Sequence, residues 1–287
     1  MPDASSIPAV GTGPSGAPDL SGVREYFPSL TQQINGQPAV FFDNPGGTQV
    51  PQQVIEATGE YFLYANANTR GAFATSQRTD LIIDEARAAV ADLLNSDAEE
   101  IIFGPNMTTL TFAISRAIGR TLTAGDEIVV TTLDHDANIA PWRAIAQEHG
   151  LVIRQVDIDP KNCTLDMKEM QAAIGEKTKL VAVGYASNAV GTINDVATII
   201  QWAKAAGALT WIDAVQYVPH GPVDVRTLGC DFLACSSYKF FGPHLGIVYG
   251  RREMLDALTP YKVRPSSDET PYKFETGTLA HELLAGL

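Results

Sequence analysis

The chain has 287 residues, of which 45% are hydrophobic and 18% are charged. This composition is typical of a globular protein with room for a large hydrophobic core. No apolar stretch of the sequence approaches the length of a membrane span. The formal net charge of −13 argues against a nucleic-acid or an anionic membrane partner, because both would repel an acidic surface.

The cysteines and the N-terminus exclude several further classes. Cys163, Cys230 and Cys235 are odd in number and irregularly spaced, so we expect neither a disulfide framework nor a metal site. The N-terminus has no basic segment followed by an apolar one, so we expect no secretory signal. The predicted location is the cytoplasm.

Residues 1–20 are rich in Pro, Gly, Ser and Ala and are predicted to form a flexible N-terminal arm. Within them, residues 11–16 spell G-x-G-x-x-G, a pattern that binds dinucleotides when it joins a strand to a helix. No strand or helix pattern flanks it, so we interpret it as a chance match. Residues 21–287 are predicted to form one large domain.

Strand and helix patterns alternate from Gln37 onward. We expect strands at residues 39–42, 100–103, 127–132, 151–156, 179–184, 208–212, 231–236 and 246–250. We expect helices at residues 51–65, 76–94, 107–118, 138–149, 166–174 and 195–206, with Ser76 as a helix N-cap. Alternation with near-continuous apolar strands predicts an α/β fold, a mainly parallel sheet with helices on both faces. Ligands bind such sheets outside the carboxyl ends of the strands.

A single lysine follows one of these predicted strands. Lys239 comes three residues after Ser236, at the end of the strand 231–236 and before a glycine-containing turn. Partial desolvation there would free its amine to form a Schiff base with an aldehyde. Taken alone, such a lysine is more often a solvated surface charge.

Polar side chains follow three other strands. Thr108 and Thr109 open a helix and could hold a phosphate, or one of them could simply cap the helix. His135 follows the strand 127–132 and could stack on a flat ring or move a proton, or lie on the surface. Asn188 follows the strand 179–184 and could donate to a ligand oxygen, or form a turn.

Asp213 ends the apolar strand 208–212. A carboxylate at that place is unfavourable to bury without a cationic partner, and no lysine or arginine is adjacent in sequence. A protonated ring nitrogen of a cofactor would supply that partner. The alternative is an aspartate that caps a helix.

The order of these residues along the chain resembles the fold-type I pyridoxal-phosphate enzymes. More narrowly, it resembles the class V aminotransferase family in its cysteine desulfurase and selenocysteine lyase branch, from about Val40 to the end of the chain. The segments that carry the resemblance are Phe42-Asp43-Asn44, Ser76-Gln77-Arg78, His135-x-x-Asn138-x-x-Pro141-Trp142, Ser187-Asn188-x-x-Gly191-Thr192, Asp213-x-x-Gln216-x-x-Pro219-His220, Asp224-Val225 and Phe274-Glu275-x-Gly277-Thr278.

The resemblance implies a role for each candidate residue. Lys239 would bind pyridoxal phosphate as a Schiff base, Asp213 would keep the ring nitrogen protonated, and His135 would stack on the ring. The remaining implied roles fall to Asn188 and Gln216 at the ring hydroxyl, to Thr108, Thr109, Ser236 and Tyr238 at the phosphate, and to Asn44 and Arg70 on the substrate side. Thr278 would reach the phosphate of the neighbouring subunit, which implies a homodimer with shared active sites.

The sequence departs from the family at three places. Tyr238 replaces a histidine, and Pro45-Gly46-Gly47 replaces a pair of small residues near the substrate. The sequence ends at Leu287, whereas family members continue into a small C-terminal domain with the substrate-binding arginine and the sulfur-accepting cysteine. Residues 21–287 are thus expected to be the cofactor-binding large domain, with the small domain absent.

The function predicted from this resemblance is that of a pyridoxal-phosphate-dependent enzyme. It would act on an amino acid substrate through Lys239, in the manner of a cysteine desulfurase. The alternatives are an epimerase, a lyase or an aminotransferase of the same family, and a non-catalytic paralogue that binds the cofactor.

Overall fold

The computed structural model describes residue 20 and residues 22–287 of the chain. The predicted flexible arm, except for Leu20, and the G-x-G-x-x-G segment lie outside the described residues. Among the described helices, none has both the length and the apolar character needed to cross a lipid bilayer.

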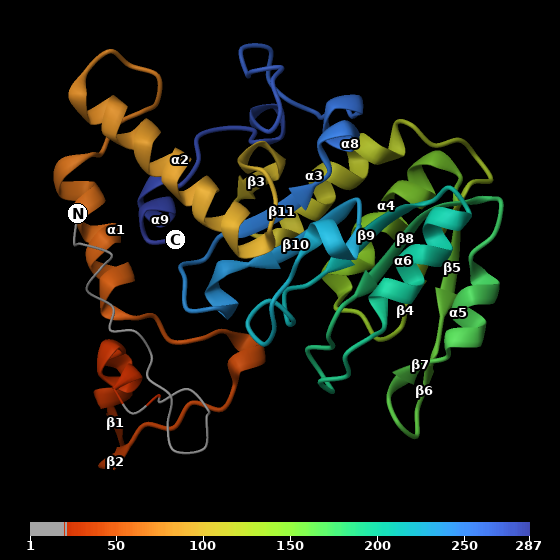
Figure 1. Cartoon of the computed structure of the whole chain (residues 1–287), viewed down its shortest axis with the longest axis horizontal. Coiled ribbons are helices and arrows are strands. Elements are labelled where there is room, and N and C mark those ends of the chain that lie inside the picture. Colours follow the sequence, from red (N-terminus) through yellow and green to blue (C-terminus); the bar gives the residue numbers. More distant parts are fainter. Residues whose placement is uncertain (1–19, 21) are drawn as a thin grey trace.

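A seven-stranded sheet with the strand order β3-β11-β10-β9-β8-β4-β5 forms the centre of the fold (Figure 1). Its strands are β3 (Ile101–Gly104), β4 (Glu127–Thr131), β5 (Val152–Val156), β8 (Thr178–Gly184), β9 (Leu209–Asp213), β10 (Phe232–Ser236) and β11 (Gly246–Gly250). The neighbours from β10 to β5 pair in parallel, and β11 is antiparallel to both β10 and β3. The predicted mainly parallel sheet is confirmed, whereas the direction of β11 was not foreseen.

Helices cover both faces of this sheet, as predicted. The helices are α1 (Gln52–Tyr64), α2 (Ala74–Leu94), α3 (Met107–Gly119), α4 (Ala140–His149), α5 (Met167–Ala173), α6 (Val196–Ala205), α7 (Val225–Leu228), α8 (Arg252–Ala257) and α9 (His281–Ala285). Strand side chains alternate between two hydrophobic cores, because successive residues of a strand point to opposite faces. Val129 packs in the core that includes residues of α2, α5 and α6, and Ile128 packs in the core that includes residues of α3 and α4.

The predicted strand at residues 39–42 is wrong. The chain instead pairs earlier, in a short hairpin of β1 (Gln33–Ile34) and β2 (Gln37–Pro38), whose turn uses positive φ angles at Asn35 and Gly36. Residues 39–42, which follow β2, pair with no described strand. Two of the apolar side chains that suggested a strand are exposed, Val40 at 68% and Phe42 at 93%. A second small hairpin joins β6 (Ile158–Asp159) to β7 (Thr164–Leu165).

Ser76 does not cap its helix, which corrects a second prediction. Helix α2 begins at Ala74, two residues earlier than expected, and Phe73 occupies the N-cap position. The Ser76 hydroxyl donates to the Asn68 carbonyl at 2.6 Å and accepts from the Gly71 N–H at 2.7 Å. The serine therefore ties the preceding loop to the first turn of α2.

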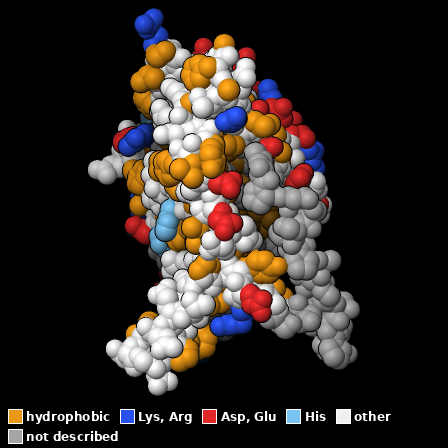
Figure 2. Space-filling model, turned by 90° about the vertical axis from the view of Figure 1, so that its left-hand side faces the viewer, with side chains coloured by type: hydrophobic (Ala, Val, Ile, Leu, Met, Phe, Trp, Pro, Cys, Tyr) orange, Lys and Arg blue, Asp and Glu red, His pale blue; other side chains and the backbone are white. Residues whose placement is uncertain are grey.

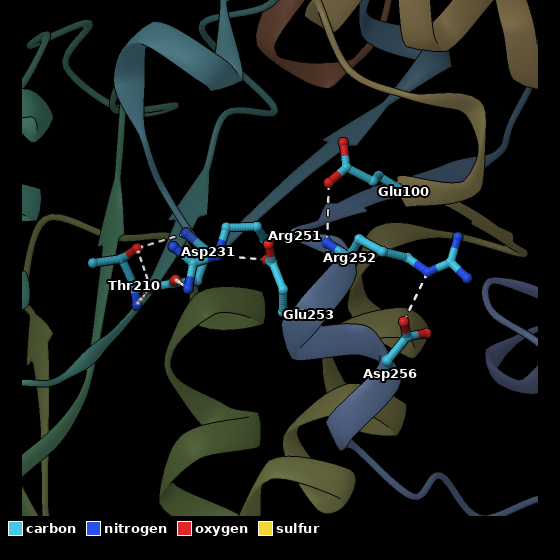
Figure 3. A network of polar contacts seen from close by, with 7 residues as sticks. All are labelled: Glu100, Thr210, Asp231, Arg251, Arg252, Glu253 and Asp256. Carbon is cyan, nitrogen blue, oxygen red and sulfur yellow. Dashed lines mark hydrogen bonds and ion pairs between the residues drawn. The ribbon is translucent and has the colours of Figure 1, made fainter.

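Polar contacts fasten the amino ends of β9 and β10, at the edge of the sheet away from the carboxyl ends (Figure 3). Asp231, 4% exposed, accepts from the Thr210 N–H at 2.9 Å and hydroxyl at 3.0 Å, and pairs with Arg251 at 3.3 Å. Nearby, Glu100 accepts from the Arg252 N–H at 3.0 Å, where α8 begins. These contacts join the amino ends of the strands and leave the carboxyl ends free of them.

Candidate active site

A cavity opens at the carboxyl ends of β4, β8, β9 and β10, where the topology of the sheet predicts a ligand site. Its volume is about 650 Å³, including the part that is open to solvent. Eight of the predicted site residues line it, namely Thr108, His135, Asn188, Asp213, Gln216, Ser236, Tyr238 and Lys239. Residues up to 131 positions apart in the sequence are thus brought to one place, as predicted from their positions after strands.

Lys239 presents its amine to the cavity from a short 3-10 turn that directly follows β10. The residue is 6% exposed, its Nζ donates to the Pro45 carbonyl, and Nζ lies 4.3 Å from the centre of the Tyr238 ring. The turn is closed by the Ser237 hydroxyl, which donates to the Pro243 carbonyl at 2.5 Å. The lysine is therefore not a solvated surface charge.

Asp213 is a buried carboxylate at the end of β9. It is 7% exposed and accepts from the Val215 N–H at 3.0 Å. Burial raises its pKa above the ordinary value, while the Val215 N–H and the charges of His135 and Lys239 oppose that rise. Among the ion pairs of the described residues, none includes Asp213. The site therefore contains a buried acid that a cationic ligand group would stabilise.

Asp134 is a cavity residue that the sequence analysis did not select. Its carboxyl accepts from the Gly184 N–H at 2.7 Å and from Asn138 Nδ2 at 3.1 Å. Burial raises its pKa to about 8, the Gly184 N–H lowers it, and the charge of Asp213 raises it further. The next residue, His135, is exposed, and its Nδ1 accepts from the Ala137 N–H at 3.0 Å. The only sequence signal for Asp134 was its position directly before His135, which had been selected as a candidate residue.

The N-terminus of α3 borders the same cavity through Met107 and Thr108. Asn106 caps this helix, because its Oδ1 accepts from the Thr109 N–H at 2.8 Å. Helix α3 touches the sheet backbone to backbone here, since a Cβ on Gly246 would lie 2.1 Å from the Asn106 carbonyl carbon. The side chain of Thr109 is exposed and does not line the cavity.

Pro45 supplies a backbone carbonyl that the sequence analysis did not foresee. It accepts from Lys239 Nζ and from Gln216 Nε2, the latter at 3.1 Å. The segment is held by Thr48, whose N–H donates to the Tyr238 carbonyl at 2.9 Å. Asn44 is exposed beside Pro45 and is not a lining residue. Asn188 is half-buried in the cavity wall.

Arg70 and Thr278 lie in a second cleft. Both are exposed, and the cleft also contains Tyr272 and His281. The Arg70 guanidinium carbon lies 5.3 Å from the centre of the Tyr272 ring, and the Arg70 N–H donates to Asp80 at 3.1 Å. The structure therefore does not bring these two predicted residues into the cavity that holds Lys239 of the same chain.

The three cysteines do not offer a thiolate to the cavity. Cys230 and Cys235 are completely buried, and burial raises the pKa of each thiol to about 12. Cys163 is half-buried in the turn between β6 and β7. None of them lines the cavity around Lys239.

Comparison with known proteins identifies the family to which the chain belongs. The model of the family described as Aminotransferase class-V matches residues 40–287. The chain belongs to the class V aminotransferase family. As a member of that family it is a pyridoxal-phosphate-dependent enzyme, and the predicted family, enzyme class and cofactor are thereby confirmed.

Individual relatives point to the cysteine desulfurase branch of the class V family. A cysteine desulfurase of Dickeya dadantii (strain 3937) is 37% identical over 272 residues, which cover 89% of this chain and 66% of the relative. The apo structure of a cysteine desulfurase from Thermococcus onnurineus NA1 matches with a TM-score of 0.85 at 32% identity, over 93% of this chain and 68% of that one. The chain therefore spans about two thirds of the length of these relatives.

A third relative of this class V chain is a structure with the cofactor present. It is a variant of C-DES with glycine covalently linked to its pyridoxal phosphate, and it matches with a TM-score of 0.80 at 25% identity, over 92% of this chain and 71% of that one. The cavity described above fits the same group. Asp213 lacks the cation that a protonated pyridine nitrogen would supply, and the N-terminus of α3 favours a phosphate.

Proposed function

We propose that this chain binds pyridoxal phosphate through Lys239 and uses it to activate an amino acid, with L-cysteine as the first candidate substrate. One observation carries the proposal. The buried amine of Lys239 and the buried carboxyl of Asp213, which has no ion-pair partner among the described residues, line one cavity. They stand at the ends of β10 and β9, which are hydrogen-bonded neighbours.

Several side chains of the cavity would hold the cofactor. Asp213 would pair with the ring nitrogen, and His135 would lie against the ring, where it excludes water. The further residues proposed for binding are Thr108, Thr109, Ser236 and Tyr238 for the phosphate, with the N–H groups of α3, and Asn188 and Gln216 for the ring hydroxyl. Bound there, pyridoxal phosphate supplies an aldehyde that links to amines and a cationic ring that withdraws electrons from the substrate Cα.

Lys239 would then accept the α-proton at Nζ. The burial of its side chain limits competition from water, and the Pro45 carbonyl gives the nitrogen a fixed acceptor next to the cavity. Asp213 would hold the proton of the ring nitrogen in place throughout. Asn44 and Arg70 remain proposed substrate-side residues, and Arg70 lies in the second cleft.

We further propose that two copies of the chain associate and share active sites. Arg70 and Thr278 lie in a cleft apart from the cavity of their own chain, so each is available to a neighbouring subunit. The face that carries α1 and α2 bears hydrophobic side chains (Figure 2), including Leu63 at 73% and Leu81 at 51% exposure. A second copy would remove these side chains from water. The cytoplasmic location expected from the sequence stays a prediction.

Mixing inactive variants tests the shared sites. Lys239→Ala and Thr278→Ala are purified separately and then allowed to exchange subunits. Recovery of activity in the mixture, together with a dimeric mass by sedimentation, supports a shared site. A monomeric mass for the active protein would contradict it.

Reduction and peptide mapping test the main proposal. After incubation with pyridoxal phosphate, borohydride should fix the pyridoxyl group to Lys239, and Lys239→Arg should not be labelled. Addition of amino acids to the loaded protein then identifies the substrate, with L-cysteine expected to change the absorption spectrum and to exchange its α-proton with the solvent. A label on another lysine, or no bound cofactor, would overturn the assignment of the site.

A further inference from the structure

We propose that Asp134 is a positioning residue that fixes His135 at the active-site cavity by joining the turn that carries the histidine to strand β8. The inference rests on the proposed function, because it concerns the side chain proposed to lie against the cofactor ring. It goes beyond that function by naming the group that determines where this side chain lies.

The two carboxyl oxygens of Asp134 bind two different elements. Oδ1 accepts from the Gly184 N–H, at 2.7 Å, at the end of β8. Oδ2 accepts from Asn138 Nδ2, at 3.1 Å, in the 3-10 turn that follows the histidine. Asn138 is completely buried, and its own N–H donates to the His135 carbonyl at 2.8 Å. One carboxyl thus connects β8 with both ends of the turn around His135.

Gly184 is the fixed end of this connection. It pairs with Asp213 in the ladder between β8 and β9, so its position is set by the centre of the sheet. A Cβ at residue 184 would lie 2.7 Å from Asp134 Oδ1, which is closer than a carbon and an oxygen can approach without a shift. The absence of a side chain at this residue therefore permits the bond to Asp134.

His135 has little else to hold it. Its side chain is exposed, and its Nδ1 accepts from the Ala137 N–H of its own turn at 3.0 Å. That bond orients the ring relative to the turn, but it does not orient the turn relative to the sheet. The bonds of Asp134 to Gly184 and Asn138 supply that second constraint.

Asparagine is the substitution that best reproduces the hydrogen bonds of a neutral Asp134. Burial, the main cause, and the neighbouring charge of Asp213 raise the pKa of Asp134 to about 8, which favours the neutral carboxyl. The other titratable side chains of the cavity wall are those of His135, Tyr238 and Lys239. Asparagine at residue 134 would accept from Gly184 with its oxygen and donate to Asn138 after that amide turns over, because amide nitrogen and oxygen differ little in size.

Histidine ring signals in NMR spectra of the chain without added cofactor give the first test. His135→Asn identifies the His135 signal among those of the five histidines. We expect Asp134→Ala and Gly184→Ala to displace it, and Asp134→Asn to leave it near its original position. Gly184→Ala retains the carboxyl and Asp134→Asn removes it, so this pattern would show that the hydrogen bonds, and not the carboxyl itself, determine the position of the signal. An unmoved His135 signal in Asp134→Ala and Gly184→Ala would overturn the proposal.

Affinity for pyridoxal phosphate gives the second test. Asp134→Ala and Gly184→Ala should weaken binding about tenfold or more, since each loses a partly buried hydrogen bond that positions His135. Asp134→Asn should stay within about threefold of the original chain. Asp136→Ala is the matched control, because Asp136 is an exposed carboxylate of the same turn and does not line the cavity. It should bind the cofactor like the unaltered chain.

A double variant then separates positioning from general stabilisation. If Asp134 acts through His135, Asp134→Ala should weaken binding no further when His135 is already Asn. Full additivity of the two changes would overturn the proposal. If the unaltered chain bound no pyridoxal phosphate, the proposed function would fail, and the His135 signal would still decide the role of Asp134.

Discussion

Replacement of Asp213 by asparagine should stabilise the chain without cofactor and impair the chain that carries it. Asparagine keeps an oxygen for the Val215 N–H, which the Asp213 carboxyl binds at 3.0 Å. It removes the ionisation of an acid that is 7% exposed and has no ion pair among the described residues. The two effects have opposite signs, and each can be measured separately.

The sign of the stability effect follows from the pKa of Asp213, which burial raises above the ordinary value of 3.8. A raised pKa means that the folded chain binds the proton more tightly than the unfolded chain does. The free energy of unfolding therefore falls as the pH rises above the ordinary range of an aspartate, and this loss is complete above the raised pKa. At neutral pH, Asp213→Asn should recover about 1–3 kcal/mol, or roughly 2–10 °C in Tm.

Once pyridoxal phosphate is bound, Asp213→Asn should be unfavourable, because it should slow the reaction of the substrate. A charged hydrogen bond to the ring nitrogen contributes about 1.5–3 kcal/mol, so its loss alone should slow α-proton exchange by roughly 10- to 150-fold. Loss of the ring proton adds to that factor. Solvent deuterium exchange at the substrate Cα measures the rate, and thermal unfolding with and without pyridoxal phosphate measures the stability.

Asp224→Asn provides the control, because Asp224 caps α7 on the surface through the Thr227 N–H at 2.8 Å. It should leave exchange unchanged. Unchanged exchange in Asp213→Asn would instead make Asp213 a structural cap. A lower Tm of that variant without cofactor would refute the argument from burial.

Two further predictions concern residues away from the cavity. Glu275→Gln should lower the free energy of unfolding in urea by about 3–5 kcal/mol, because it leaves the Arg87 guanidinium, now paired at 2.9 Å with both side chains about 95% buried, without its counter-charge. A loss below about 1 kcal/mol would contradict this. In the folded chain at pH 8, an alkylating reagent should modify Cys163 and spare Cys230 and Cys235, whose thiols have a pKa of about 12. Mass spectrometry of the digested protein checks this, and early labelling of Cys235 would refute it.

The cavity could be predicted from the sequence because its residues share a positional rule. His135, Asn188 and Asp213 each follow an apolar strand, and the carboxyl ends of parallel strands meet at one edge of a sheet. To apply this rule, one needs to know where the strands lie in the sequence, but not which strands pair with one another. It therefore held although the antiparallel direction of β11 was not foreseen.

Features that depend on distant partners could not be predicted in this way. The use of Asp134 depends on Gly184, 50 residues away, and no local pattern reveals that bond. Arg70 was expected on the substrate side and Thr278 at the phosphate of a neighbouring subunit, and no local pattern indicates that the two residues line one separate cleft of their own chain. The short apolar run at residues 39–42 resembled a strand because such a run records side-chain type and not the presence of a neighbouring strand.

The antiparallel return of β11 limits how the main chain around Lys239 can move. Lys239 lies in the nine-residue connection between β10 and β11, and these two strands are hydrogen-bonded to each other along their length. The Ser237 N–H donates to the Leu245 carbonyl at 3.2 Å, so the connection is also closed at its base. Lys239 is thus mounted on a hairpin whose two arms are both anchored in the central sheet. Under the proposed function, travel of its amine between the cofactor and a substrate proton would come from rotation about the bonds of its own four-carbon stem and not from movement of the main chain.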